Sequence, residues 1–332
     1  MLKQSLKPSA NRRCVLAPIA VLVAMALASV PGLARAQACC TATGGGEFAV
    51  VGRCKHAVLA VQTTLEKGIG TFNNQGNYSR LNNVEVDDVV VSFGGGIRLF
   101  HPKWQIYGSI PTRFQYRSFA GTPGDLSAGL GDITTTVRWT ALEDNLMGIS
   151  ADDADSFIPF VDLYLGAKMP TGRAPEDSRT ATGADITGDG AWQLIVGTKV
   201  SKFVTSEHVM ELGAAYSHRF ARSIATVGGV NDFEAGDELN LRLGYLHIPN
   251  LEWSWGLNTS LKLEGKARMN GFAVPRSQSR RLRFGAHVTW GFDFPYWEAT
   301  LSGVMDALWD DAGTNLPYVG PALSLTLRRQ FP

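Results

Sequence analysis

The sequence predicts an all-β protein: a transmembrane, antiparallel, up-and-down β-barrel of about 12 strands, with both termini on the periplasmic side. Three observations lead to this prediction: an export signal at the start, a series of segments in which apolar and polar residues alternate, and connections that are short and long in turn. With 45% hydrophobic and 18% charged residues, the composition alone is that of an ordinary globular protein. The patterns, rather than the composition, therefore indicate a barrel.

Residues 1–36 form a separate module. Four basic residues precede the apolar run VLAPIAVLVAMALASV, and the small residues Ala34 and Ala36 then offer a cleavage site. This order is typical of a secretory signal peptide that is removed, rather than of an anchoring helix. Without these residues the formal net charge changes from +1 to −4, since five basic side chains and no acidic one leave. No basic block remains that would indicate nucleic-acid binding.

Residues 37–56 are rich in cysteine and glycine and precede the barrel. In an oxidising periplasm Cys54 can form a disulfide with Cys39 or with Cys40, and the sequence leaves the pairing open. A thiolate metal site is the alternative, but three cysteines without histidines at ligand spacing make a weak zinc pattern. The segment either stays in the periplasm or enters the barrel as a plug.

Residues 57–332 contain the predicted strands. No apolar run there approaches the roughly 18 residues that a membrane helix needs. In residues 250–263, for example, Leu251, Trp253, Trp255 and Leu257 alternate with polar or small residues, which is the period of a strand with unlike faces. The alternating segments lie near 57–66, 88–100, 103–118, 130–141, 157–169, 191–203, 207–220, 237–248, 250–263, 280–294, 296–309 and 317–331.

The connections between these segments alternate in length. Short turns are expected at 101–103, 204–207, 247–250 and 294–295. Long polar loops are expected at 67–87, 119–129, 170–190, 221–236, 264–279 and 310–316. Short periplasmic turns and long outer loops are the habit of outer-membrane barrels. The connection 143–156 is the exception, because its place in the alternation calls for a short periplasmic turn. It is either an ordered periplasmic excursion or a strand pair that the pattern does not reveal.

Aromatic residues support the same arrangement. Six tryptophans fall toward the periplasmic ends of the segments and two toward the outer ends, as interfacial girdles require. They are Trp104, Trp139, Trp253, Trp255, Trp290 and Trp297 on the first side, and Trp192 and Trp309 on the second. The last segment ends on Phe331, which resembles the signal read by the barrel-insertion machinery, although Pro332 follows it and Arg329 interrupts its apolar face.

Two stretches carry a family resemblance: AGLGDITTTVRW (128–139) and LGAKMPTGRAPEDSRTATGADITGDGAWQLIVGTKVSKF (165–203). They resemble the G-x-GD strand and the strand, PTG, long-loop, strand unit of the meta-pathway phenol-degradation transporters of the outer membrane. That family is distantly similar to the long-chain fatty-acid channels. The resemblance implies a barrel in the outer membrane, and transport of hydrophobic or aromatic compounds.

Charged residues occupy the predicted lumen face of the strands. They are Arg98, Arg113, Arg117, Asp132, Arg138, Asp162, Lys168, Lys199, Glu211, Arg219, Glu238, Arg242, Glu252, Lys262, Arg281, Arg283, His287 and Asp293. Charges opposite a hydrocarbon-facing surface need water or one another. The lumen is therefore either a polar conduit or an interior filled by salt-bridged side chains, and about 12 strands lies between the filled and open widths.

Three local features invite a site hypothesis. Gly131 and Asp132 predict a bend or bulge with the carboxylate turned inward to pair with an arginine. Asp185 and Asp189 in the loop TGADITGDG could supply calcium ligands, although turn chemistry explains them and the spacing is not that of an EF-hand. His218 could serve a lipid-facing Ser-His hydrolase, but no G-x-S-x-G motif or suitably placed serine accompanies it.

The sequence thus predicts an outer-membrane channel or transporter for passive passage of small solutes. Its expected partners are the lipid bilayer, the insertion machinery and a small-molecule solute. No enzyme activity, cofactor, metal or nucleic acid is expected. The alternatives are a plugged structural or docking barrel, with 143–156 and 37–56 as its working parts, and, ranked lower, a hydrolase.

Overall fold

The structure is a computed structural model that describes residues 47–52, 55–226, 229–250, 252–292 and 297–332. The predicted signal peptide (residues 1–36) and the three cysteines of the predicted disulfide lie outside the described residues. Among the described residues, no helix combines the length and the apolar character needed to cross a membrane. The helical turns present are the short 3-10 segments η1 (Glu47–Ala49), η2 (Ala154–Phe157) and η3 (Pro175–Asp177).

The described residues form a closed antiparallel barrel, which confirms the predicted fold class. One sheet of 13 strands runs in the order β4-β1-β20-β18-β17-β14-β13-β10-β9-β8-β7-β5-β6, and pairing of β4 with β5 closes it. The strands are β1 (Ala57–Gly68), β4 (Glu85–Arg98), β5 (Trp104–Ser118), β6 (Asp125–Leu130), β7 (Ile133–Leu142), β8 (Phe160–Met169), β9 (Gln193–Phe203), β10 (His208–Arg219), β13 (Glu238–His247), β14 (Trp253–Glu264), β17 (Ser279–Phe292), β18 (Trp297–Asp306) and β20 (Pro321–Phe331).

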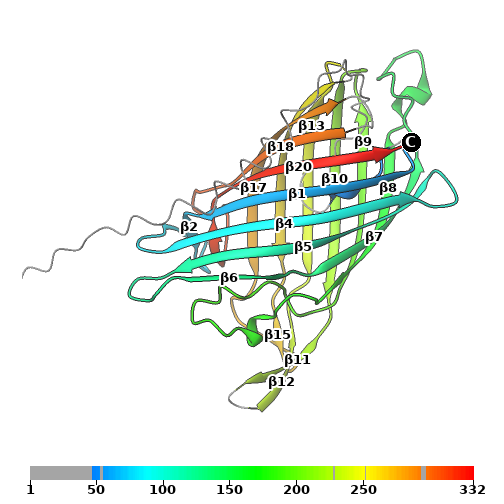
Figure 1. Cartoon of the computed structure of the whole chain (residues 1–332). Helices are drawn as coiled ribbons and strands as arrows, with labels where there is room; N and C mark the ends of the chain where they lie inside the picture. Colours follow the sequence, from blue (N-terminus) through cyan, green and yellow to red (C-terminus); the bar gives the residue numbers. More distant parts are fainter. Residues whose placement is uncertain (1–46, 53–54, 227–228, 251, 293–296) are drawn as a thin grey trace, which may run out of the picture. The chain divides into compact units, whose positions relative to one another are not determined.

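Strands β6 and β7 follow one another along a single position in the barrel wall. We call each such position, whether one strand or two in succession, a stave. Both pair with β5, β6 along residues 112–117 and β7 along residues 104–109, with Gly131 and Asp132 between them. The barrel in the described part of the chain therefore has 12 staves. Figure 1 shows the first stave, β1, between β4 and the last stave, β20, so that pairing of the first and last staves closes the wall.

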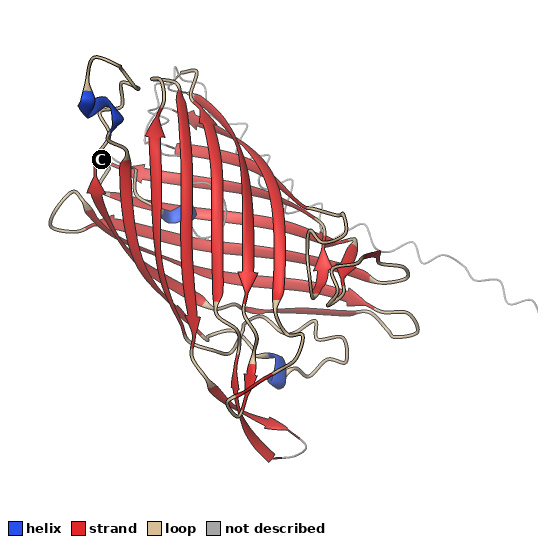
Figure 2. Cartoon of the chain, turned by 180° about the vertical axis from the view of Figure 1, so that it is seen from behind, coloured by secondary structure: helices blue, strands red, loops and turns tan. Residues whose placement is uncertain are grey.

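The two faces of the staves have opposite chemistry. Along β14, Ser254 is 1% exposed while Leu257, three residues later, is 52% exposed. The same inversion recurs around the wall, with Leu59 on β1 and Phe93 on β4 more than half exposed. Large apolar side chains outside and polar ones inside are what a wall between hydrocarbon and a polar interior requires. The barrel thus belongs in the bacterial outer membrane, and Figure 2 shows its wall from behind.

An aromatic girdle lies at the end of the barrel that carries the short turns. Trp104 stacks on Trp139 with ring centroids 5.7 Å apart, and Trp253 stacks on Trp290 at 6.0 Å. Arg329, which interrupts the apolar face of β20, lies over the rings of Trp297 and Phe331 at 5.8 and 4.9 Å. Its aliphatic stem thus stays on the apolar surface while its charge is held at the interface.

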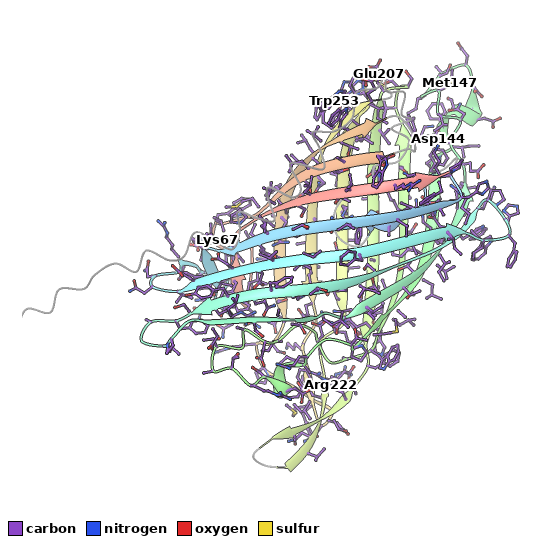
Figure 3. All side chains as sticks on the ribbon, in the orientation of Figure 1. Lys67, Asp144, Met147, Glu207, Arg222 and Trp253 are labelled. Carbon is purple, nitrogen blue, oxygen red and sulfur yellow. The ribbon has the colours of Figure 1, made fainter. Side chains whose placement is uncertain are left out.

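The connection 143–156 is an ordered excursion rather than a missed strand pair. The side chain of Asp144 is fully buried, forms an ion pair with Lys202 (2.8 Å) and accepts a hydrogen bond from the backbone N–H of Phe203 (2.9 Å). Ser156 is also buried and bonds the backbone of Ser150 and Asp153. Figure 3 labels Asp144 and Met147 in this excursion.

Small sheets extend the long connections at the other end, and the sequence patterns did not predict them. One contains β2 (Gly70–Phe72), β3 (Tyr78–Arg80) and β19 (Leu316–Val319). The other contains β11 (Arg222–Thr226), β12 (Gly229–Glu234), β15 (Arg268–Met269) and β16 (Phe272–Ala273). They tie loops that lie far apart in the sequence to one another.

Candidate functional site: the barrel interior

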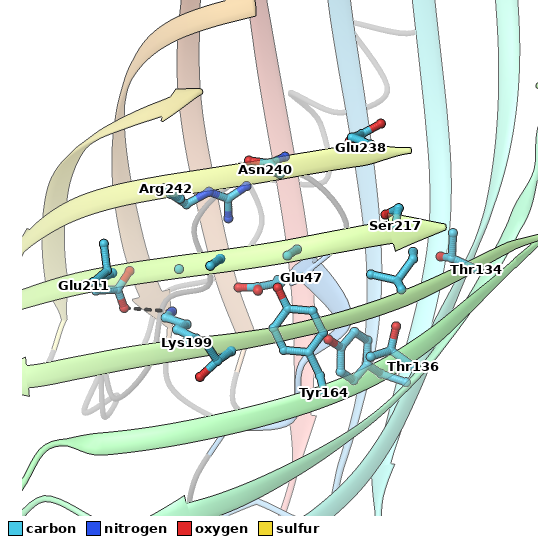
Figure 4. Close-up of a pocket in the computed structure, with 17 residues that line it drawn as sticks. Glu47, Thr134, Thr136, Tyr164, Lys199, Glu211, Ser217, Glu238, Asn240 and Arg242 are labelled. Carbon is cyan, nitrogen blue, oxygen red and sulfur yellow. Dashed lines mark ion pairs between the residues drawn. The ribbon is translucent and has the colours of Figure 1, made fainter. Parts of the chain in front are cut away.

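A cavity of about 250 Å³ lies inside the barrel wall. Side chains from β5, β7, β8, β9, β10 and β13 line it, together with Glu47 of η1. Figure 4 shows Glu47, Tyr164, Lys199 and Arg242 around this space. The Nζ of Lys199 is 2.8 Å from a carboxylate oxygen of Glu211, so these two charges compensate each other on adjacent staves. Two tyrosines, Tyr107 and Tyr164, give the same cavity aromatic surface.

Residues 47–52 pack against the inner face of the wall. Phe48, Ala49, Val50 and Val51 are buried, and η1 contacts β1, β4, β5 and β20. A Cβ atom on Gly94 would lie 2.7 Å from the Phe48 ring and 2.8 Å from the Cβ of Ala49. Only glycine therefore leaves room for the segment at that position of β4.

Three polar side chains of the wall fix the backbone of this segment. Gln105 accepts a hydrogen bond from the N–H of Val51, and Gln330 accepts one from the N–H of Gly52, both at 2.9 Å. Arg98 donates to the carbonyl of Gly52 (2.9 Å). These bonds satisfy backbone groups that would otherwise be buried without partners.

Most of the predicted lumen residues lie on the inward face of their staves. They are Arg98, Arg113, Arg117, Arg138, Asp162, Lys168, Lys199, Glu211, Arg219, Glu238, Arg242, Lys262, Arg281, Arg283 and His287. Asp132 lies in the break between β6 and β7, Glu252 lies in the turn before β14, and Asp293 falls outside the described residues.

Ion pairs join many of these charges. Arg138 pairs with Asp162, whose side chain is 1% exposed and also accepts a hydrogen bond from Thr140 (2.6 Å). Arg219 pairs with Glu238 (2.8 Å) and Glu264. Arg281 and Arg283 both contact Glu66 of β1 and Asp306 of β18. Glu66 and Asp306 were not predicted as lumen residues, because their pairing depends on which staves become neighbours.

Two inward arginines of β5, Arg113 and Arg117, differ from these charges in their contacts. Among the ion pairs between described residues, neither Arg113 nor Arg117 takes part. Arg117 donates to the carbonyl of Gly183 (2.9 Å) and lies over the ring of Tyr318 at 5.5 Å. Gln115, between the two arginines on the same face, is 1% exposed. The carboxylate that faces them is Asp88 of β4, which lies directly opposite Gln115 and interacts with both arginines. This part of the interior therefore sets two arginines against one aspartate.

The break between β6 and β7 positions the loop that follows β8. Asp132 accepts hydrogen bonds from the N–H groups of Gly172 (3.0 Å) and Asp189 (2.8 Å), and its carboxylate lies 3.3 Å from Lys168. From the sequence, we expected an inward carboxylate paired with an arginine. The inward carboxylate is found, but its cation is a lysine, because Lys168 on β8 is the inward residue beside the break.

Hydrogen bonds within the loop explain its aspartates. Asp185 accepts from the hydroxyl groups of Ser178 (2.6 Å) and Thr180 (2.9 Å), from the N–H of Arg179 (2.8 Å), and from Arg173 (2.7 Å). Burial alone would raise the pKa of this carboxyl, but the hydrogen bonds from Ser178, Arg179, Arg173 and Thr180 outweigh it and hold the pKa well below its usual range. The side chain of Arg173, two hydroxyl groups and one backbone N–H thus occupy the positions at which a calcium ion would bind.

Asp189 behaves similarly. Burial acts to raise the pKa of its carboxyl, but the charge of Lys168 and the hydrogen bond that Lys168 donates (2.6 Å) lower it to about 2. Gln193 donates a further hydrogen bond at 2.7 Å. Both aspartates therefore organise the loop through ordinary turn and ion-pair chemistry.

His218 forms part of a dyad on the outer surface of β10. Its Nδ1 lies 2.9 Å from a carboxylate oxygen of Asp237, which also accepts a hydrogen bond from Tyr216. A serine hydrolase needs a hydroxyl nucleophile beside the histidine. Among the described residues, Asp237 is the hydrogen-bond partner of the His218 ring, and Ser217 lies on the opposite, inward face. Within the described ranges, the His218 ring thus bonds a carboxylate rather than the serine hydroxyl that acyl transfer would use.

Comparison with known proteins agrees with the fold. No protein-family model matches the chain, and no curated protein matches its sequence. An outer membrane channel from Pseudomonas putida F1 superimposes with a TM-score of 0.66 at 13% identity, covering 87% of this chain and 100% of that one. The translocator domain of the autotransporter NalP from Neisseria meningitidis gives 0.44 at 11% identity, covering 83% and 88%. A FadL homologue from Pseudomonas aeruginosa gives 0.36 at 8% identity, covering 84% and 91%.

The superposition on the Pseudomonas putida protein supports the barrel fold. The meta-pathway resemblance is not confirmed by these comparisons, which fit an outer-membrane channel more generally. The chain therefore has the architecture of a 12-stranded outer-membrane β-barrel.

Proposed function

We propose that the protein is a channel for passive passage of small solutes across the outer membrane. The observation that supports this most is the cavity inside a closed barrel, which charged, polar and apolar side chains line together, while the outer surface of the barrel is apolar. A barrel of this width has an interior that side chains fill only in part. The proposed orientation places the short turns in the periplasm and the long loops outside, as in other barrels of this class.

The cavity suggests the size and chemistry of the solute. An apolar protein cavity of about 150 Å³ accepts a benzene molecule. The cavity here, about 250 Å³, offers the rings of Tyr107 and Tyr164, with Thr134, Asn240 and Arg242 as polar groups. This combination suits a small aromatic solute with a hydroxyl or carboxylate substituent. Arg113 and Arg117 would favour anionic solutes, because their two positive charges exceed the single negative charge of Asp88 opposite them.

Residues 47–52 would act as a constriction. They occupy the inner face of β4 and β5, and Glu47 reaches the cavity itself. A solute larger than one ring would have to displace this segment. We also propose that Phe331 and the rest of β20 are read by the insertion machinery during assembly.

Solute flux into proteoliposomes tests this function. Benzoate suits the purpose because its charge slows passage through lipid alone, and the trisaccharide raffinose serves as a larger solute. We expect protein-dependent benzoate entry and exclusion of raffinose, with protein-free liposomes as the blank. If a barrel with folded electrophoretic mobility admits neither solute, the protein is a closed docking barrel. The paired interior charges and the buried segment 47–52 are the observations that favour that second function.

A further inference from the structure

Two histidines and a glutamate meet at the end of the barrel that carries the short turns. Glu207 ends the turn between β9 and β10, His208 begins β10, and His247 ends β13. The metal-binding atoms of all three lie within 4.8 Å of one another. Figure 3 shows Glu207 at the same end as Trp253 of the girdle. We infer that Glu207, His208 and His247 form a binding site for a divalent transition-metal ion, with zinc as the ion that best fits the ligands.

The barrel register brings the two imidazoles together. His208 and His247 are directly opposite each other on adjacent antiparallel staves. Opposite residues of such a pair have Cβ atoms about 4.5–5.5 Å apart. Both lie on the outward face, where their rings stack with centroids 4.6 Å apart and an angle of 21° between the planes. The sequence separates them by a whole hairpin, so the sequence patterns did not reveal the pair.

The turn places the carboxylate beside them. The hydroxyl of Thr205 accepts hydrogen bonds from the N–H groups of Glu207 (3.3 Å) and His208 (3.2 Å). The carbonyl of Glu207 accepts one from the N–H of Ile248 (2.8 Å), next to His247. Within the described part of the chain, the Glu207 carboxylate forms no ion pair or hydrogen bond. This exposed carboxylate can therefore turn toward the imidazoles without breaking a contact.

The ring nitrogens of the two histidines are in the state that a metal site needs: one is held by a tyrosine and one lacks a partner among the described residues. The Nδ1 of His208 lies 2.6 Å from the hydroxyl oxygen of Tyr245, which leaves its Nε2 for a metal. Metal-binding histidines usually hold their second nitrogen in a hydrogen bond of this kind. The Nδ1 of His247 is buried and has no hydrogen-bond partner among the described residues. A bound cation would give that nitrogen the partner it lacks.

The ligand set selects the class of ion. Two imidazoles and one carboxylate are a common zinc set, with the fourth position open to water. Tetrahedral zinc ligands lie about 2.0–2.2 Å from the ion and therefore about 3.4 Å from one another. From their outer limit of 4.8 Å, the three atoms must approach each other by about 1.4 Å. Rotation of the exposed Glu207 side chain and of the two rings supplies this movement. The stacked pair thus represents the metal-free arrangement of the residues.

Zinc titration of the refolded full chain in detergent tests the site. The protein should carry no polyhistidine tag, and Cys39, Cys40 and Cys54 should be replaced by serine to remove competing thiolates. Calorimetry should show one saturable site per chain. We expect His208→Ala, His247→Ala and Glu207→Gln each to weaken zinc binding by about 10-fold or more. Tyr245→Phe, which removes the positioning hydroxyl, should weaken it by about 10-fold.

His218→Ala is the matched control, because this histidine is also on the outer surface of β10 but at the other end. It should bind zinc as the parent does. Heat-modifiable electrophoretic mobility reports whether each variant has folded. If a histidine variant does not assemble, Glu207→Gln still removes one proposed zinc ligand and can be tested in its place. The inference is wrong if the parent shows no saturable zinc binding, or if the folded variants bind zinc with undiminished affinity.

Discussion

Replacing Gly94 by alanine should loosen residues 47–52 from the barrel wall. The added methyl group would lie 2.7 Å from the Phe48 ring and 2.8 Å from the Cβ of Ala49, closer than real Cβ contacts. Both contacts belong to the segment, so relief of the clash moves the segment rather than the wall. Overpacking of this kind costs about 1–3 kcal/mol. That free energy corresponds to roughly a 5- to 150-fold fall in the ratio of docked to undocked segment.

A few hydrogen bonds, each worth about 1 kcal/mol, help to hold the segment against the wall. The free energy lost through overpacking is of the same size, so it is large enough to change how often the segment is docked. Raffinose entry into proteoliposomes should therefore rise in Gly94→Ala. Gly95→Ala is the matched control, because its methyl group would point outward and meet the Leu59 side chain at an ordinary 3.4 Å. Equal raffinose entry for Gly94→Ala and the parent, or an equal rise in Gly95→Ala, would refute the constriction by residues 47–52.

Three further predictions concern charges. Asp162→Asn should lower the free energy of unfolding in urea by about 3–5 kcal/mol, because it leaves the Arg138 charge buried without its partner. An unchanged urea midpoint would show that this ion pair does not contribute to stability. Replacing both Arg113 and Arg117 by glutamine should shift the reversal potential in a salt gradient toward cation preference while the barrel still assembles, and an identical potential would exclude a role for them in selectivity. The carboxyls of Asp185 and Asp189 have lowered pKa values, so their contribution is complete above about pH 4 and is lost as pH falls toward 2. Amide exchange of residues 171–190 should accelerate over that interval, and Asp185→Asn should show fast exchange already at pH 7.

The wall of the barrel was predictable because lipid imposes a period of two on every stave. Leu257 and Ser254 differ in exposure because their side chains face different solvents, and that difference is local in sequence. The stave 130–141 was placed correctly but begins earlier, at Asp125, since the break at Gly131 and Asp132 interrupts the alternation. The small sheets in the loops were missed, because strands of two to six residues are too short to show a clear period.

The interior was predictable only in part. Alternation places Arg138 and Asp162 on the inward face, but their pairing follows from the register of β7 with β8. Glu47 was not expected at the cavity, since residues 37–56 carry no pattern that separates a plug from a periplasmic segment. The inward packing of Phe48 and Ala49 depends on glycines of β4, more than 40 positions away in the sequence. Such a fit is visible only once the stave is folded.

The most direct test of the channel is the conductance of the purified, refolded protein in a planar lipid bilayer. We predict stable, stepwise currents from the parent protein, because the interior cavity is polar and the ion-paired charges leave room beside residues 47–52. Deletion of residues 37–52 should raise the size of each step. A barrel that inserts and remains silent, both with and without residues 37–52, would contradict an aqueous route through the interior.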